Sequence, residues 1–139
     1  MKNYTIKEVS QLFNLPASTL RYYEDIGILS NISRTSTGKR VYNECHINRL
    51  KTICCFKGTG MSISKLKDFF SYEEKGLEKI DDILLLLTEQ RNEVEEKLFQ
   101  LQSDLEHVKR KLNYYGDIKE ALDSGTDLPC WKNYKGKQY

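Results

Sequence analysis

The sequence is poor in the residues that reactive or metal-binding sites need. Its 139 residues include four cysteines, two histidines and two prolines. No C-x-x-C pair occurs, which argues against a zinc ribbon or a thioredoxin-type motif. His46 and His107 lie in different segments, and there is no H-E-x-x-H, Walker loop or nucleophile elbow. We therefore predict no enzyme activity, no cofactor and no metal site. The cysteines are Cys45, Cys54, Cys55 and Cys130.

Long hydrophobic runs are also absent. The longest apolar run, residues 83–87, is far shorter than the roughly 20 residues that cross a bilayer. The N-terminus lacks the charged-then-apolar pattern of a signal peptide. We expect no membrane partner and a cytoplasmic location, where cysteines are kept reduced.

The charge is divided unevenly along the chain, although the net charge is only +2. Residues 1–60 carry nine Lys/Arg against four Asp/Glu, whereas residues 61–116 carry nine against twelve. The remaining residues are balanced, four against four. A basic N-terminal part indicates a polyanionic partner, although a solvated basic face would have the same composition.

The first 25 residues predict two short helices joined by a tight turn. A capping box at Thr5 and Glu8 begins a run of apolar residues at helical spacing that extends to about Phe13. Pro16 follows in a turn, and a second helix is expected over about 17–25. This arrangement is typical of a helix-turn-helix.

The next segment predicts a small β wing followed by two helices. Residues 28–42 contain β-forming residues on either side of a polar, basic loop, which indicates a two-stranded hairpin. A third helix is expected over about 44–57, ending at the Gly58-Thr-Gly60 segment, and Ser62 can cap a fourth.

A heptad pattern follows, with one interruption at Arg91. It extends from 80 to 115, which would make a helix of about 54 Å, too long to be covered by the first 75 residues. We expect a second copy of the chain to cover it, the alternative being a helix folded back on its own domain. Gly116 is expected to interrupt the helix. The predicted dimerisation residues are Leu84, Leu87, Val94, Leu98, Leu101, Leu105, Val108 and Leu112.

The second helix offers the best candidates for reading DNA. Leu20 must face inward, so Ser18, Arg21 and Tyr22 point away from it. Ser and Arg side chains suit base edges and phosphates in a major groove, and the Tyr22 hydroxyl can reach a phosphate. From the residues alone, Tyr23 fits the core better than a DNA contact.

Basic residues in the hairpin and beyond it are further candidates for phosphate contacts. Arg34, Lys39 and Arg40 cluster in the expected wing, where Gly38 permits a tight loop. Lys57 and Lys65, together with Lys67, carry a weaker signal, because solvated lysines are common on any surface.

Five segments together resemble the MerR family of transcription regulators. In order they are YTIKEV at 4–9, LRYYE at 20–24, GIL at 27–29, GKRVY at 38–42 and TGMSI at 59–63. The resemblance implies a mostly α fold with a small β wing: a winged helix-turn-helix head and a long helix that forms an antiparallel coiled coil in a homodimer.

The resemblance also implies a mechanism. Such regulators bend and untwist a promoter whose −35 and −10 elements are too far apart, and thereby realign them for RNA polymerase, an indirect partner. Arg21, Tyr22 and Tyr23 would be contacts of the recognition helix, and Arg34 and Arg40 contacts of the wing. The implied division is a DNA-binding domain at 1–75, a dimerisation helix at 76–116 and a short extension at 117–139.

The cysteine positions bear on the effector. The chain lacks the cysteine spacing of the family's metal and iron–sulfur sensors, and it is similar to the AdhR/NmlR-type branch, associated with aldehyde or thiol stress. That branch has a cysteine in the context matched here by Cys55, before the Gly60-Met61 step. A buried, inert cysteine is the simpler alternative. A sensor of a metal or another small molecule, and a coiled-coil interaction module that does not act on DNA, also stay open.

Overall fold

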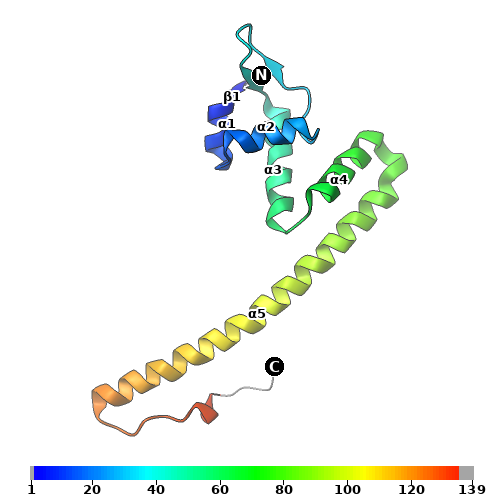
Figure 1. Ribbon diagram of the computed structural model, residues 1–139. Helices are drawn as coiled ribbons and strands as arrows, with labels where there is room; N and C mark the ends of the chain where they lie inside the picture. The colour runs from blue at the N-terminus through cyan, green and yellow to red at the C-terminus, as the bar shows by residue number, and fades with distance from the viewer. Residues whose placement is uncertain (1, 135–139) are drawn as a thin grey trace. The chain divides into compact units, whose positions relative to one another are not determined.

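The computed structural model describes residues 2–134 and is mostly helical with one small sheet (Figure 1). This confirms the predicted fold class. Two compact units meet within the last long helix, the first ending at Arg91 and the second beginning at Asn92. The elements are β1 (Tyr4–Thr5), α1 (Ile6–Phe13), α2 (Ala17–Asp25), β2 (Ser33–Arg34), β3 (Arg40–Tyr42), α3 (Glu44–Gly58), α4 (Ile63–Lys75), the 3₁₀ turn η1 (Gly76–Lys79), α5 (Ile80–Ser124) and the 3₁₀ turn η2 (Trp131–Asn133).

The helix-turn-helix forms as predicted, from α1 and α2. The Thr5 hydroxyl oxygen caps α1 by accepting a hydrogen bond from the backbone amide of Glu8 at 3.2 Å. The same hydroxyl donates to the Glu8 carboxylate, also at 3.2 Å. The capping box is therefore incomplete, because the carboxylate bonds the hydroxyl and not the backbone amide. Asn14 takes the left-handed conformation that ends α1, at φ 52°. Pro16 then directly precedes α2.

The predicted hairpin is present, and it belongs to a three-stranded sheet. In β2 and β3, Ser33 pairs with Val41 and Arg34 with Arg40, while Gly38 adopts φ +84° in the loop between the strands. β1 pairs antiparallel with the other edge of β3 and was not predicted. A two-residue strand has no periodicity to detect, so its partner reveals it.

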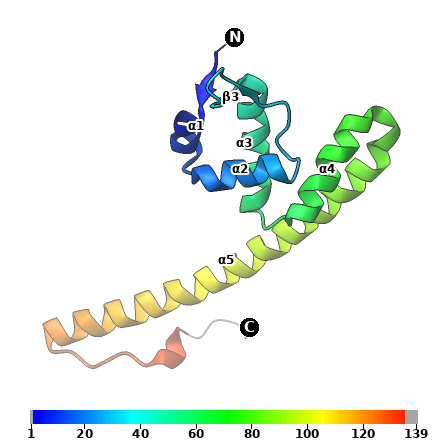
Figure 2. The same ribbon diagram turned by 45° about the horizontal axis from the view of Figure 1, so that its top comes forward.

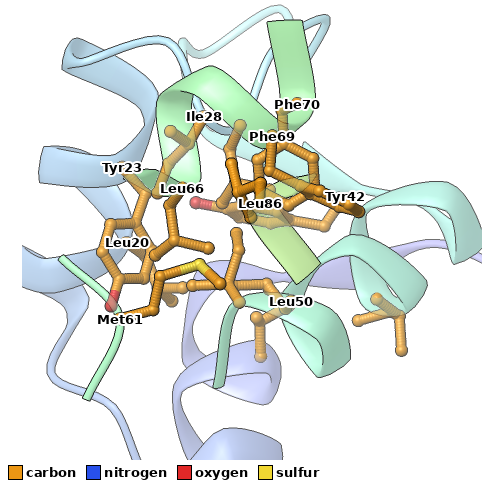
Figure 3. Close-up of a cluster of buried hydrophobic side chains, with 14 residues drawn as sticks. Leu20, Tyr23, Ile28, Tyr42, Leu50, Met61, Leu66, Phe69, Phe70 and Leu86 are labelled. Atoms are coloured by element: carbon orange, nitrogen blue, oxygen red, sulfur yellow. The ribbon is translucent and has the colours of Figure 1, made fainter. Parts of the chain in front are cut away.

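The core of the first unit joins the head to the start of α5. Figure 3 shows Leu86 of α5 among side chains of α2, β3, α3 and α4, including Tyr42 and Phe69. Tyr42 is fully buried, and Phe69 meets Phe56 edge-on at 5.1 Å between ring centroids. By packing, the head therefore continues to Arg91, because the first turns of α5 complete its core.

His46 has a structural role at the start of α3. Asn43 caps this helix, and its backbone amide donates to His46 Nδ1 at 3.0 Å. The other ring nitrogen, Nε2, lies 2.8 Å from the carbonyl oxygen of Ser30. The side chain is 5% exposed, with both ring nitrogens engaged, so it stabilises the junction between the wing and α3.

The prediction that Gly116 interrupts the long helix is wrong. α5 has 45 residues and runs through Gly116 to Ser124. A glycine inside a helix costs only about 1 kcal/mol relative to alanine, which the flanking helical turns tolerate. The helix ends at Gly125, whose φ is +67°, where the Thr126 amide donates back to the Ala121 carbonyl at 3.0 Å.

In the second unit, the segment after α5 folds back along that helix (Figure 2). Trp131 packs against Tyr114 at 5.2 Å between ring centroids, and Lys111 Nζ lies 3.8 Å from the centroid of the indole. The hydroxyl of Tyr134 donates to Asp117. Aromatic packing thus attaches the end of the described chain to α5.

Candidate nucleic-acid interface and dimerisation seam

The exposed face of α2 has the composition predicted from its sequence. Leu20 is fully buried, whereas Ser18, Arg21 and Tyr22 are exposed, Tyr22 by 47%. α2 is nine residues long and is fixed on one side by the core, so these three side chains form a rigid polar face. A single exposed helix of this kind fits the width of a major groove.

Tyr23 lies in the core, which favours the structural alternative for this residue. It is 6% exposed and belongs to the buried cluster with Leu20 and Leu50. Burial also raises the pKa of its hydroxyl. Its ring therefore supports α2 from behind and cannot stack on a nucleic acid in this conformation.

Both wing arginines pair with one residue of α2, Glu24. Arg40 Nε lies 2.6 Å from Glu24 Oε2, and Arg34 Nη2 lies 3.6 Å from Oε1. Arg34 also donates to the carbonyl of Gly38 at 3.1 Å. Hydrogen bonding to Glu24 raises the pKa of Arg40 further above its usual range. Both arginines were predicted to contact phosphates, and no local pattern in the sequence marks Glu24, the residue that holds the wing on α2.

The three candidate lysines differ in their surroundings. Lys39, in the wing loop, and Lys57, in the last turn of α3, are both exposed. Lys65 is half-buried, and its ammonium donates to Gln90 Oε1 at 3.5 Å. Lys39 and Lys57 therefore have the accessibility that a phosphate contact needs, whereas Lys65 is directed towards α5.

The two adjacent cysteines of α3 differ in their exposure. Cys54 is half-buried, and its burial raises the pKa of the thiol. Cys55 is exposed near the C-terminal end of the helix, and Lys51, one turn earlier, is exposed as well. Of the two, Cys55 is the thiol that a small electrophile can reach.

Two apolar stripes share the start of α5. One stripe packs on the head through Ile83, Leu86 and Leu87, of which Leu86 is 7% exposed. The other is the heptad seam. Most of its residues are exposed, and the exceptions are Leu87 and Val94, which are half-buried. The first turns of α5 thus pack on the head. The exposed seam residues are Leu84, Leu98, Leu101, Leu105, Val108 and Leu112.

Neither a metal site nor a membrane-spanning helix is found in the part of the chain that the structure describes. Among residues 2–134, no group of three or more His, Cys, Asp or Glu side chains is arranged to hold a metal ion. Within the same residues, no helix is both long and apolar enough to cross a bilayer.

A helix-turn-helix with a basic wing, followed by a long helix with an exposed apolar seam, defines the class of winged-helix DNA-binding regulators. The profile of the MerR HTH family of regulatory proteins matches residues 4–73. An uncharacterised HTH-type transcriptional regulator of Haemophilus influenzae is 30% identical over 128 residues, which cover 91% of this chain and 94% of that protein. The chain belongs to the MerR family of DNA-binding transcription regulators.

Other relatives and solved structures agree. AdhR of Bacillus subtilis is 31% identical over 86 residues, 62% of this chain and 61% of that protein. The crystal structure of HiNmlR, a MerR family regulator lacking the sensor domain and bound to promoter DNA, matches with a TM-score of 0.79 at 27% identity, covering 97% of both chains. A putative MerR family regulator from Listeria monocytogenes matches with a TM-score of 0.76 at 25% identity, over 88% of this chain and 92% of that one.

The pairing of the wing with Glu24 leads to the first prediction. Glu24→Gln removes the charge that both arginines share, so the wing should open more often while α2 stays folded. A hydrogen bond to a charged group contributes about 1.5–3 kcal/mol, and partial exposure reduces this to about 1 kcal/mol. We expect hydrogen exchange of the amides at 35–39 to accelerate about fivefold, measured by NMR. Asp25→Asn, an exposed neighbour, is the control, and equal exchange in both variants would contradict the pairing.

Proposed function

We propose that the chain is a homodimeric regulator that binds double-stranded promoter DNA and distorts it in response to an effector sensed at Cys55. The observation that carries the DNA-binding part is the rigid polar face of α2, with Ser18, Arg21 and Tyr22 exposed beside a basic wing. HiNmlR, which matches over 97% of the chain, is bound to promoter DNA in its crystal structure. By the same likeness, the partners of this chain are promoter DNA and a second copy of itself.

In the proposed complex, the side chains divide the work of recognition. Arg21 reads base edges in the major groove, while Ser18 and Tyr22 bind phosphates beside it. Lys39 and Lys57 add phosphate contacts from the wing and from the end of α3. Arg34 and Arg40, held by Glu24, set the position of the wing and add positive charge to that surface.

The proposed action on DNA is bending and untwisting. In a promoter with an overlong spacer, the −35 and −10 elements lie on different faces of the duplex. A dimer that bends and untwists the spacer brings them back into register for RNA polymerase, which the regulator thus affects without a catalytic step. Deforming DNA costs several kcal/mol, so the two heads must be held rigidly at a fixed separation.

The specificity of Arg21 is tested by comparing duplexes. Arg21→Ala should weaken binding to the cognate operator by roughly five- to 150-fold and binding to random duplex much less, because a good base contact is worth about 1–3 kcal/mol. Lys39→Ala, the matched control, should weaken both alike and reduce the slope of log K against log salt by about one unit. Fluorescence anisotropy titrations at several salt concentrations measure both. Wild-type affinity of Arg21→Ala for the operator would show that α2 does not read the DNA.

The dimer is tested at the middle of the seam. Leu98→Glu should convert the protein to a monomer in sedimentation, because it removes roughly 1.5–3 kcal/mol of apolar burial and adds a buried charge. Phe99→Glu, which introduces the same charge at an exposed position outside the seam, should remain a dimer. A Leu98→Glu variant that stays dimeric with unchanged melting would refute the seam.

The effector step is an addition of the Cys55 thiol to an electrophile. With an aldehyde, sulfur bonds to the carbonyl carbon and the thiol proton moves to the oxygen, giving a hemithioacetal without any oxidant. The adduct adds bulk near the end of α3, beside the turn that leads to α4. Such a local packing change can bias two conformations of the head.

Reporter assays separate the two thiols. Under aldehyde or diamide challenge, Cys55→Ser should lose induction while it keeps its affinity for DNA, and Cys54→Ser should still respond. The half-buried Cys54, with its raised thiol pKa, is the matched control because it has less thiolate to react. If both single variants and the double variant respond fully, the effector acts elsewhere and Cys55 is inert.

A further inference from the structure

One polar side chain interrupts the apolar contact between α5 and the head. Ile83, Leu86 and Leu87 dock the first turns of α5 on the core, and Gln90 continues the same stripe. Gln90 is 5% exposed. An uncharged amide so deep in an otherwise apolar contact needs specific partners.

Its partners surround the turn between α3 and α4. Gln90 Nε2 donates to Thr59 Oγ1 at 2.9 Å and to the Thr59 carbonyl oxygen at 3.3 Å. Its Oε1 accepts a hydrogen bond from Lys65 Nζ at 3.5 Å. One amide of α5 therefore binds both the residue that ends α3 and a residue in the first turn of α4.

Thr59 extends this network into the last turn of α3. Its backbone amide donates to the carbonyl oxygen of Cys55 at 3.2 Å, and its hydroxyl donates to that of Phe56 at 2.6 Å. The carbonyl groups at the end of α3 are thus capped by the same residue that Gln90 holds. Thr59 therefore links the side chain of Gln90 to the backbone carbonyl of Cys55.

A buried amide restricts geometry more than apolar side chains do. Leucines can slide over one another with little loss of contact, whereas the hydrogen bonds of Gln90 are satisfied together in only one orientation. Polar residues within apolar helix contacts are known to fix register in this way. Moving α5 relative to α3 would break the two bonds from Gln90 to Thr59 and leave the buried Gln90 amide unsatisfied.

We propose that Gln90 is a positioning residue that fixes the angle between the winged helix-turn-helix head and the start of α5. This inference rests on the proposed function. In a homodimer, the angle sets the separation of the two recognition helices, and hence the half-site spacing that the protein accepts. The contact that fixes this angle lies one helical turn from Cys55, because the Thr59 backbone amide donates to the Cys55 carbonyl oxygen.

The test measures spacing preference with the full-length dimer. Operator duplexes with the cognate half-site spacing, and with one base pair added or removed, are titrated by fluorescence anisotropy. Wild type should prefer the cognate spacing by about tenfold, and Gln90→Leu should reduce this preference to about twofold, with binding to random duplex unchanged. Gln100→Leu makes the same substitution at an exposed glutamine of the same helix and should behave as wild type.

A second variant approaches the network from its other end. Thr59→Val keeps the backbone cap of α3 but removes the hydroxyl that Gln90 binds. It should therefore also reduce the spacing preference, by about threefold. This variant tests the inference if Gln90→Leu does not fold. Wild-type spacing preference in the folded variants, even with lowered melting temperatures, would overturn the inference and leave Gln90 a purely structural residue. A wild-type dimer that binds its operator without any spacing preference would overturn the proposed DNA distortion itself, and the inference with it.

Discussion

The apolar surface of α5 is larger than the head can cover, and this constraint organises the molecule. The head buries the stripe that contains Ile83 and Leu86, and this packing completes its own core. Leu84, only two residues from Leu86, stays 56% exposed, and most seam residues further along the helix, from Leu98 to Leu112, are exposed as well. Each exposed leucine forgoes roughly 1.5–3 kcal/mol of burial. A second helix of similar length can recover that energy, which is why we infer a homodimer.

Within the head, one carboxylate decides how the basic residues are used. Without Glu24, both arginines would lose their ion pairs with α2, and the wing would have to be ordered on binding DNA. With Glu24, the wing and α2 form one surface before DNA arrives, so less conformational entropy is lost on binding. Glu24 also places one negative charge beside the basic wing, close to exposed cations such as Arg21 and Lys39.

The C-terminal end of α3 is where the thiol, the helix cap and the contact with α5 meet. Cys55 is exposed there, and Thr59 caps the helix and binds Gln90. The end of a helix is a suitable place for such a contact, because its last carbonyl groups need hydrogen-bond partners from outside the helix. A change in those partners can move the helix end without disturbing the core behind it. The exposed Cys55 thiol therefore lies about one helical turn from Thr59, the residue that binds Gln90 of α5.

Those features of the fold that depend on local periodicity could be predicted from the sequence. The two helices of the helix-turn-helix, the hairpin, the burial of Leu20 and the long apolar seam all follow from neighbours three or four residues apart, or from a turn residue such as Pro16. The continuation of α5 through Gly116 does not, because a glycine is a weak local signal that the surrounding helix overrides.

Only the tertiary structure decided the partners of polar side chains that bind residues far away in the sequence. Glu24 and Arg40 are 16 residues apart, and Thr59 and Gln90 are 31 apart, so no periodic pattern connects them. The same holds for β1, a two-residue strand that exists because β3 lies beside it. By itself, the sequence determined the helices and the face each one turns to the core, since these depend on local spacing. The tertiary structure decided the wing's attachment to α2 and the junction of α3 with α5, because hydrogen bonds and ion pairs depend on distances that exist only after the chain has folded.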